Sequence, residues 1–150
     1  MKPVLQALVL AERVYQDITG KKIIAGTFNR VLFSRQSVVK EVTLPDATKR
    51  KMARGGMQGG SPFAYMSLTD VCDKARLILQ FVNLSKNVVL FGTDVEVTCS
   101  DRLGTVEVVI GLPQLPIQEE GTYAFEVVCE GEILGSHRIT AAELKFEEGA

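Results

Sequence analysis

Apolar and polar residues alternate along most of the chain, and a two-residue period predicts β-strands rather than helices. The clearest case is residues 76–84, where Leu77, Leu79 and Phe81 fall on one face. Alternation also marks residues 95–99, 105–112 and 122–129. Turn-forming clusters separate these stretches at residues 85–87, 101–104 and 130–131. This spacing is typical of antiparallel strands joined by short turns.

The first third of the chain predicts a hairpin. Residues 4–15 have apolar residues at both odd and even positions, which suits a strand covered on both faces. A helix is the alternative, but no capping residue precedes the run and a turn-rich segment follows at residues 17–21. Residues 22–33 are rich in β-branched and aromatic residues and are expected to return as the second strand. Gly26 inside that strand predicts a bulge or a close contact.

Together these patterns predict one all-β domain over residues 1–150. We expect an antiparallel two-sheet sandwich of immunoglobulin-like character, with about eight strands and one long basic loop. Residues 63–69, 88–99 and 132–140 supply further strands. Residues 141–146 either extend the last strand or form a helical turn, and residues 147–150 should fray.

The most specific local pattern is LPQLPIQEEGTYAFEVVCEGEILGSHRIT. An acidic turn ending at Gly121 leads into Tyr123, and alternating apolar residues follow. The pattern resembles the tyrosine corner of immunoglobulin-like sandwiches, in which a tyrosine hydroxyl bonds to an upstream main-chain group. The resemblance implies that Tyr123 reaches residues 115–117. Phe125 holds the place of the usual core cysteine, so the inter-sheet disulfide of that family is absent.

The chain also resembles a family of small uncharacterised bacterial proteins. The resemblance rests on ALVLAERVYQDITGKKIIAGTFNRV, RLILQFVNLSKNVVLF and GTYAFEVVCEGEILGS, and with them it covers about two thirds of the chain. It implies a fold and no chemistry, so no catalytic residue is carried over. The chain departs from the family in the length and basicity of the stretch after Phe33.

That stretch, residues 34–62, is the anomaly of the sequence. Connections in compact domains are about 4–6 residues long, and loops above about 15 are uncommon. Val38, Val42 and Leu44 indicate a strand in its first part, but PDATKRKMARGGMQGGSP has no apolar period. The segment holds six basic and two acidic residues, whereas the rest of the chain holds eleven basic and sixteen acidic residues. A basic segment of charge +4 is therefore attached to a body of charge −5.

Three interpretations of residues 34–62 stay open. The first is a flexible, solvated surface loop. The second is a segment that contacts a protein partner, either as an added edge strand or as a flap that orders on binding. The third is contact with nucleic acid or phosphate, in which basic side chains neutralise phosphates and glycines allow a close main-chain approach. The residues concerned are Lys49, Arg50, Lys51, Arg54, Gly55 and Gly56.

Groups for catalysis are sparse. The chain has one histidine, His137, which we interpret as structural, and no Gly-x-Ser-x-Gly motif. The three cysteines show no CxxC pair and are expected to be free thiols in a reducing compartment. Acidic residues at the predicted loop tips lack the spacing of a calcium loop. We therefore expect no catalytic residues, no metal and no cofactor.

The overall charge of the chain indicates no particular class of partner. The net charge is −1 and the pI about 5.9, so nothing global attracts the chain to nucleic acid or an anionic membrane. The apolar run at residues 4–11 is followed by charged residues where a signal peptide would be cleaved. The sequence therefore predicts a non-catalytic protein-interaction or assembly module of the bacterial cytoplasm. Its contacts would use an edge strand or residues 34–62, with a protein partner or self-association and no membrane or small-molecule substrate. The alternative is a nucleic-acid-binding accessory protein that uses residues 49–60.

Overall fold

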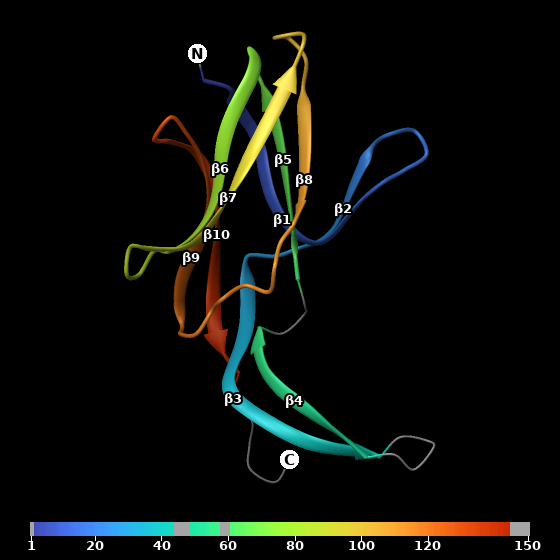
Figure 1. Ribbon diagram of the computed structural model, residues 1–150, viewed down its shortest axis with the longest axis vertical. Coiled ribbons are helices and arrows are strands. Elements are labelled where there is room, and N and C mark those ends of the chain that lie inside the picture. The colour runs from blue at the N-terminus through green and yellow to red at the C-terminus, as the bar shows by residue number, and fades with distance from the viewer. Residues whose placement is uncertain (1, 44–48, 58–60, 145–150) are drawn as a thin grey trace.

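The computed structural model describes the backbone of residues 2–43, 49–57 and 61–144, and the side chains of residues 2–34 and 61–144. Within those ranges the chain forms ten strands and no helix. The strands are β1 (Val4–Gln16), β2 (Lys22–Thr27), β3 (Arg30–Thr43), β4 (Lys49–Met57), β5 (Phe63–Thr69), β6 (Asp73–Asn83), β7 (Val88–Cys99), β8 (Val106–Gly111), β9 (Gly121–Cys129) and β10 (Glu132–Glu143). They form a four-stranded sheet, β2-β1-β5-β8, and a six-stranded sheet, β4-β3-β10-β9-β6-β7 (Figure 1). The prediction of an all-β, two-sheet fold is confirmed.

The core lies between the two sheets and is built from alternate residues of their strands. Leu10 and Met66 enter it from the four-stranded sheet, and Phe81, Tyr123 and Phe125 enter from the six-stranded sheet. The ring centroid of Phe81 lies 4.8 Å from that of Phe125 and 5.4 Å from that of Tyr123. Full burial of one such large apolar side chain contributes about 1.5–3 kcal/mol. The inward faces predicted for residues 76–84 and 122–129 are therefore confirmed.

The sequence predicted one strand over residues 22–33, and this prediction is wrong, because the structure divides these residues between β2 and β3. The backbone N–H of Phe28 donates to the carbonyl of Leu10 in the four-stranded sheet, at 3.4 Å. The carbonyl of the next residue, Asn29, accepts from the N–H of Thr140 in the six-stranded sheet, at 2.9 Å. The chain thus passes from one sheet to the other between β2 and β3. Because it enters the second sheet alongside β10 in the same direction, β3 and β10 pair in parallel, and the expectation of a purely antiparallel fold is wrong here.

Part of the long segment after Phe33 is a β-hairpin. The strand expected in its first part is confirmed, since β3 continues to Thr43. The expectation of an irregular loop is wrong for residues 49–57, which form β4 and pair antiparallel with β3. The sequence of β4 has no apolar alternation, so its strand conformation is stabilised by main-chain hydrogen bonds to β3. β4 ends the six-stranded sheet, and the hairpin leads away from the sandwich (Figure 1). The interpretation of this segment as a contact for a partner stays a prediction.

Three local expectations have mixed outcomes. The prediction that β1 is covered on both faces is wrong for most of its length, because both faces are fully buried only at Leu10 and Ala11. Gly26 has a φ of +73°, and a Cβ placed there would lie 3.1 Å from the Cβ of Glu12, so the predicted close contact is confirmed. β10 runs to Glu143, which confirms the extended alternative for the start of residues 141–146. Residues 147–150 lie outside the described chain.

Candidate protein-contact site at the edge of the six-stranded sheet

β7 forms the edge of the six-stranded sheet opposite β4. It pairs along its length with β6, from Asn83↔Val88 to Asp73↔Cys99. Among the described strands none pairs with its other side. A terminal strand presents main-chain N–H and C=O groups away from the sheet, and those groups can pair with a strand from another chain.

The first half of β7, residues 88–93, exposes apolar side chains at this edge. The exposed fractions are 47% for Val88, 55% for Val89 and 37% for Leu90. Residues 88–93 carry no charge and no proline. Natural edge strands are usually protected from association by lysine, proline or inward-pointing charge. We refer to residues 88–93 as the β7 edge.

The turn before the β7 edge is fixed by polar contacts. The side-chain oxygen of Asn83, which is buried, accepts from the backbone N–H of Lys86 at 3.2 Å. The Asn83 amide nitrogen donates to the carboxylate of Glu119 at 2.9 Å, and Lys86 Nζ lies 2.9 Å from the same carboxylate. Asn87 has a φ of +55°, a conformation that asparagine tolerates better than most residues. These contacts hold the start of β7 in place, so the exposed strand is presented in a defined position.

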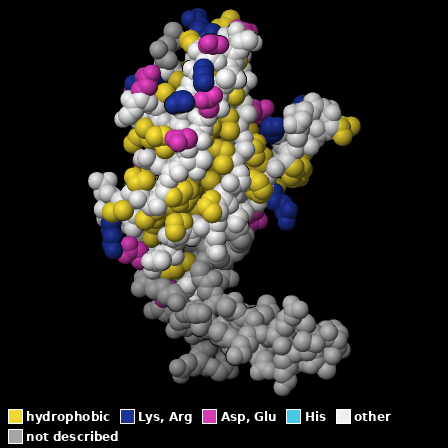
Figure 2. Space-filling model, viewed as in Figure 1, with side chains coloured by type: hydrophobic (Ala, Val, Ile, Leu, Met, Phe, Trp, Pro, Cys, Tyr) yellow, Lys and Arg dark blue, Asp and Glu magenta, His cyan; other side chains and the backbone are white. Residues whose placement is uncertain are grey.

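The second half of β7 carries acidic side chains on the outer face of the sheet. Val95 and Val97 are buried, and the alternate residues Asp94 and Glu96 are exposed. Glu96 lies 3.0 Å from Lys74 Nζ and 3.4 Å from Arg76 Nε on β6. The hydrogen bond from Lys74 lowers the pKa of Glu96 below its usual value, and Arg76 acts in the same direction. Figure 2 shows charged side chains near the upper end of the described body and apolar side chains across its middle.

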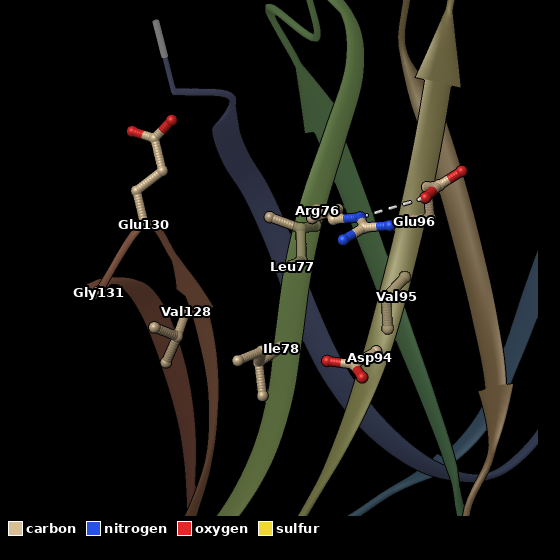
Figure 3. A pocket seen from close by; sticks show the side chains of 9 residues that line it. All are labelled: Arg76, Leu77, Ile78, Asp94, Val95, Glu96, Val128, Glu130 and Gly131. Carbon is tan, nitrogen blue, oxygen red and sulfur yellow. Dashed lines mark hydrogen bonds and ion pairs between the residues drawn. The ribbon is translucent and has the colours of Figure 1, made fainter.

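A cavity of about 390 Å³ lies on the outer face beside this half of β7. Figure 3 shows its lining residues, which come from β6, β7 and the end of the β9–β10 hairpin. Ile78 stands between Asp94 and Val128, its cross-strand neighbours on β7 and β9. We call this the acidic cavity, because its lining holds three carboxylates and one guanidinium. The lining residues are Arg76, Leu77, Ile78, Asp94, Val95, Glu96, Val128, Glu130 and Gly131.

The acidic cavity suits a basic side chain with an apolar stem. Ile78 and Val128 offer apolar surface for the methylene groups of a lysine or arginine. Asp94 and Glu130 offer charge to its head group, and neither makes an ion pair within the described side chains. The lining holds no histidine, cysteine or serine, the groups that most often act as base or nucleophile. The described residues also contain no cluster of three or more metal-binding side chains.

The structure separates the residues singled out in the sequence into two places. Lys49, Arg50, Lys51 and Arg54 lie with Gly55 and Gly56 on β4, at the edge farthest from β7 in the strand order. Their side chains, and those of Met52 and Met57, fall outside the described ones. Their predicted contact with a partner stays a prediction.

The predicted structural residues, Gly121, Tyr123 and Phe125, lie together at the start of β9. The hydroxyl of Tyr123 donates to the carbonyl of Glu119 at 2.8 Å. The tyrosine corner is therefore present, but its acceptor lies nearer in sequence than the predicted residues 115–117. Leu115 and Ile117 are instead buried in the core, and the carbonyl of Leu115 accepts from the backbone N–H of Ile117 at 2.8 Å.

The remaining candidate groups are the single histidine and the three cysteines. His137 Nε2 lies 2.9 Å from the carbonyl of Phe28, consistent with the structural role expected of it. The cysteines form no disulfide: Cys72 is exposed, Cys99 half-buried and Cys129 buried. No described segment forms a helix that could span a membrane.

The chain matches no family model, and no curated protein matches it. Its function is therefore inferred from its own residues, and the family resemblance stays a prediction.

Sequence reasoning missed the β7 edge. The run Val88-Val89-Leu90-Phe91 is apolar at both parities, which normally indicates a strand buried on both faces. A usable signal was the absence of charge and proline from residue 88 to residue 93, directly after a turn. Only the strand order places this run at an edge.

Proposed function

We propose that this protein is a non-catalytic protein-interaction or assembly module of the bacterial cytoplasm that binds another protein chain at the β7 edge. The observation that carries the proposal is the uncharged first half of a terminal strand, which exposes three apolar side chains at residues 88–90. The three unpaired cysteines support a reducing compartment.

Strand addition is the mode of binding that suits this surface. A strand from the partner would pair with the free main-chain groups of β7, and alternate side chains would pack on the two faces of the edge. The fixed turn at residues 84–87 supports this mode, because a preorganised edge loses less conformational entropy on binding. Because the β7 edge is exposed, we expect the purified protein to self-associate through it.

We propose in addition that the sandwich is immunoglobulin-like. The tyrosine corner at Tyr123 supports the assignment, and so does a sheet in which the β9–β10 hairpin lies beside β6 and β7. The parallel β3–β10 pair and the β3–β4 hairpin would be additions to that plan.

A nucleic-acid-binding function is the alternative, supported by the four basic residues of β4 and by exposed Arg30 and Arg138 on the neighbouring strands. Glu126 on β9 and Asp94 on β7 lie further across the outer face, and their charge disfavours a continuous phosphate-binding surface. Binding of a short RNA at low salt, lost as salt rises, would support this alternative.

Light scattering on the purified protein over a range of concentrations tests the proposal. Wild-type protein should show a mass above the 16.4 kDa of one chain that rises with concentration. The double variant Val88→Lys/Val89→Lys should remain at the mass of one chain, because lysines on both faces oppose edge pairing. Val4→Lys is the matched control, since Val4 on β1 has the same exposed fraction, 47%, as Val88. Wild-type protein that stays at one-chain mass at every concentration would overturn the proposal, as would a double variant that assembles like wild type.

A further inference from the structure

The two ends of the six-stranded sheet carry opposite charge. β4 holds Lys49, Arg50, Lys51 and Arg54 and no acidic residue. β7 holds Asp94 and Glu96 and no basic residue. One terminal strand therefore has a charge of +4 and the other −2. Opposite charges on facing strands stabilise a pair, and like charges destabilise it.

The two edges also match as β-strands. β4 has nine residues and β7 has twelve, so a β4 strand can pair with β7 along its whole length. Each strand is terminal in the described sheet, and each has a side on which no described strand pairs. If β4 of one copy pairs with β7 of another, the two six-stranded sheets join into one continuous sheet.

Charge also distinguishes this pairing from the symmetric ones. Two β4 strands would bring together eight positive charges, and two β7 strands would bring together four negative charges. The acidic cavity adds a specific element, because it lies beside the second half of β7 and presents Asp94 and Glu130 to a basic side chain. The basic residues that could fill it on an adjoining strand are those of β4.

We propose that the partner at the β7 edge is β4 of a second copy of this chain, in a head-to-tail arrangement. This inference rests on the proposed function and names the partner. A head-to-tail contact leaves one unused edge at each end of the assembly. It therefore builds rings or filaments, whereas a symmetric contact would stop at a dimer.

Two variants, each with one edge disabled, test the proposal. Val88→Lys/Val89→Lys disables β7 and keeps β4. Arg50→Glu/Arg54→Glu disables β4 and keeps β7, and the residues paired with these positions on β3 are Val42 and Val38, so no like-charge pair arises within the hairpin. Each variant alone should stay at the mass of one chain in light scattering. An equimolar mixture should give a heterodimer of about twice 16.4 kDa, because only one functional interface forms.

The controls separate the two proposals. Arg13→Glu/Arg102→Glu reverses the same amount of charge at exposed positions elsewhere and should assemble like wild type. A β4 variant that also assembles like wild type would overturn the head-to-tail pairing and leave the β7 edge as a contact for another surface. A mixture that stays at one-chain mass would overturn it as well. Wild-type protein that never assembles would overturn the proposed function and this inference together.

A peptide measurement keeps the proposal testable if a variant does not fold, which thermal melting by circular dichroism would reveal. The peptide KRKMARGGM, residues 49–57, should bind wild-type protein and reduce its scattering mass toward that of one chain. A peptide of the same composition in scrambled order should bind at least tenfold more weakly. Equal effects of the two peptides would contradict a register-specific pairing with β7.

Discussion

Removing one oxygen atom from the tyrosine corner should measurably weaken the fold. Tyr123 is 1% exposed, and its hydroxyl donates to the Glu119 carbonyl at 2.8 Å. In Tyr123→Phe the ring keeps its stacked contact with Phe81, whose centroid lies 5.4 Å away, while the hydroxyl and its bond to Glu119 are removed. This bond joins the start of β9 to the segment that precedes it.

The size of the effect follows from the loss of one hydrogen bond. An intramolecular hydrogen bond contributes about 0.5–1.5 kcal/mol net, and a buried partner left unsatisfied costs about 1–3 kcal/mol. Glu119 is only half-buried, so water can reach its carbonyl in part. We therefore expect Tyr123→Phe to lower the free energy of unfolding by about 1–2 kcal/mol. At about 2–4 °C per kcal/mol for a domain of this size, Tm should fall by about 2–8 °C.

Urea unfolding followed by tyrosine fluorescence or circular dichroism measures this effect. The midpoint should fall while the slope with urea stays constant, because the surface exposed on unfolding is unchanged. Tyr15→Phe is the control, since Tyr15 is 53% exposed and its variant should stay within about 0.5 kcal/mol of wild type. If Tyr123→Phe is as stable as the Tyr15 control, the corner bond does not stabilise the fold and the reasoning is refuted.

Three further predictions concern the same architecture. Gly121→Ala should lower the free energy of unfolding by about 1–3 kcal/mol, because its φ is +156° and a Cβ there would lie 2.9 Å from a serine hydroxyl oxygen; an unchanged urea midpoint would contradict this. The hydroxyl of Thr19 and neighbouring N–H groups lower the pKa of Asp17, so its contribution to stability is present above the unfolded pKa of about 4 and is lost as pH falls through the lower folded pKa. Asp17→Asn should therefore flatten the acid limb of the stability curve, and an unchanged limb would count against it. Burial raises the pKa of Cys129, so iodoacetamide should label exposed Cys72 first, and mass spectrometry that finds equal rates would contradict the placement.

Local patterns in the sequence predicted those parts of the fold that local residues determine. Leu77, Leu79 and Phe81 alternate because β6 has one face on the core, and that period is visible in the sequence. The turn at Glu130 and Gly131 was also readable, because a glycine between two alternating stretches indicates a two-residue hairpin turn. Both residues adopt the positive φ that is typical of such a turn.

Features that depend on distant pairing could not be read from the sequence. The crossing between sheets at Phe28 and Asn29 depends on hydrogen bonds to Leu10 and Thr140, which lie far away in the chain. β4 has no apolar alternation, and its strand conformation follows from pairing with β3. The candidate site was missed for the same reason, because Val88 and its neighbours are an exposed edge only once β7 is known to be last in the strand order.

Hydrogen exchange of the β7 edge tests the central claim most directly. Backbone amides of residues 88–93 should exchange more slowly at a protein concentration where the scattering mass exceeds that of one chain than at a concentration where it does not. The added protection should be absent in Val88→Lys/Val89→Lys and present in Val4→Lys. Protection that appears on assembly at other strands, with the amides of residues 88–93 unchanged, would contradict binding by strand addition at this edge.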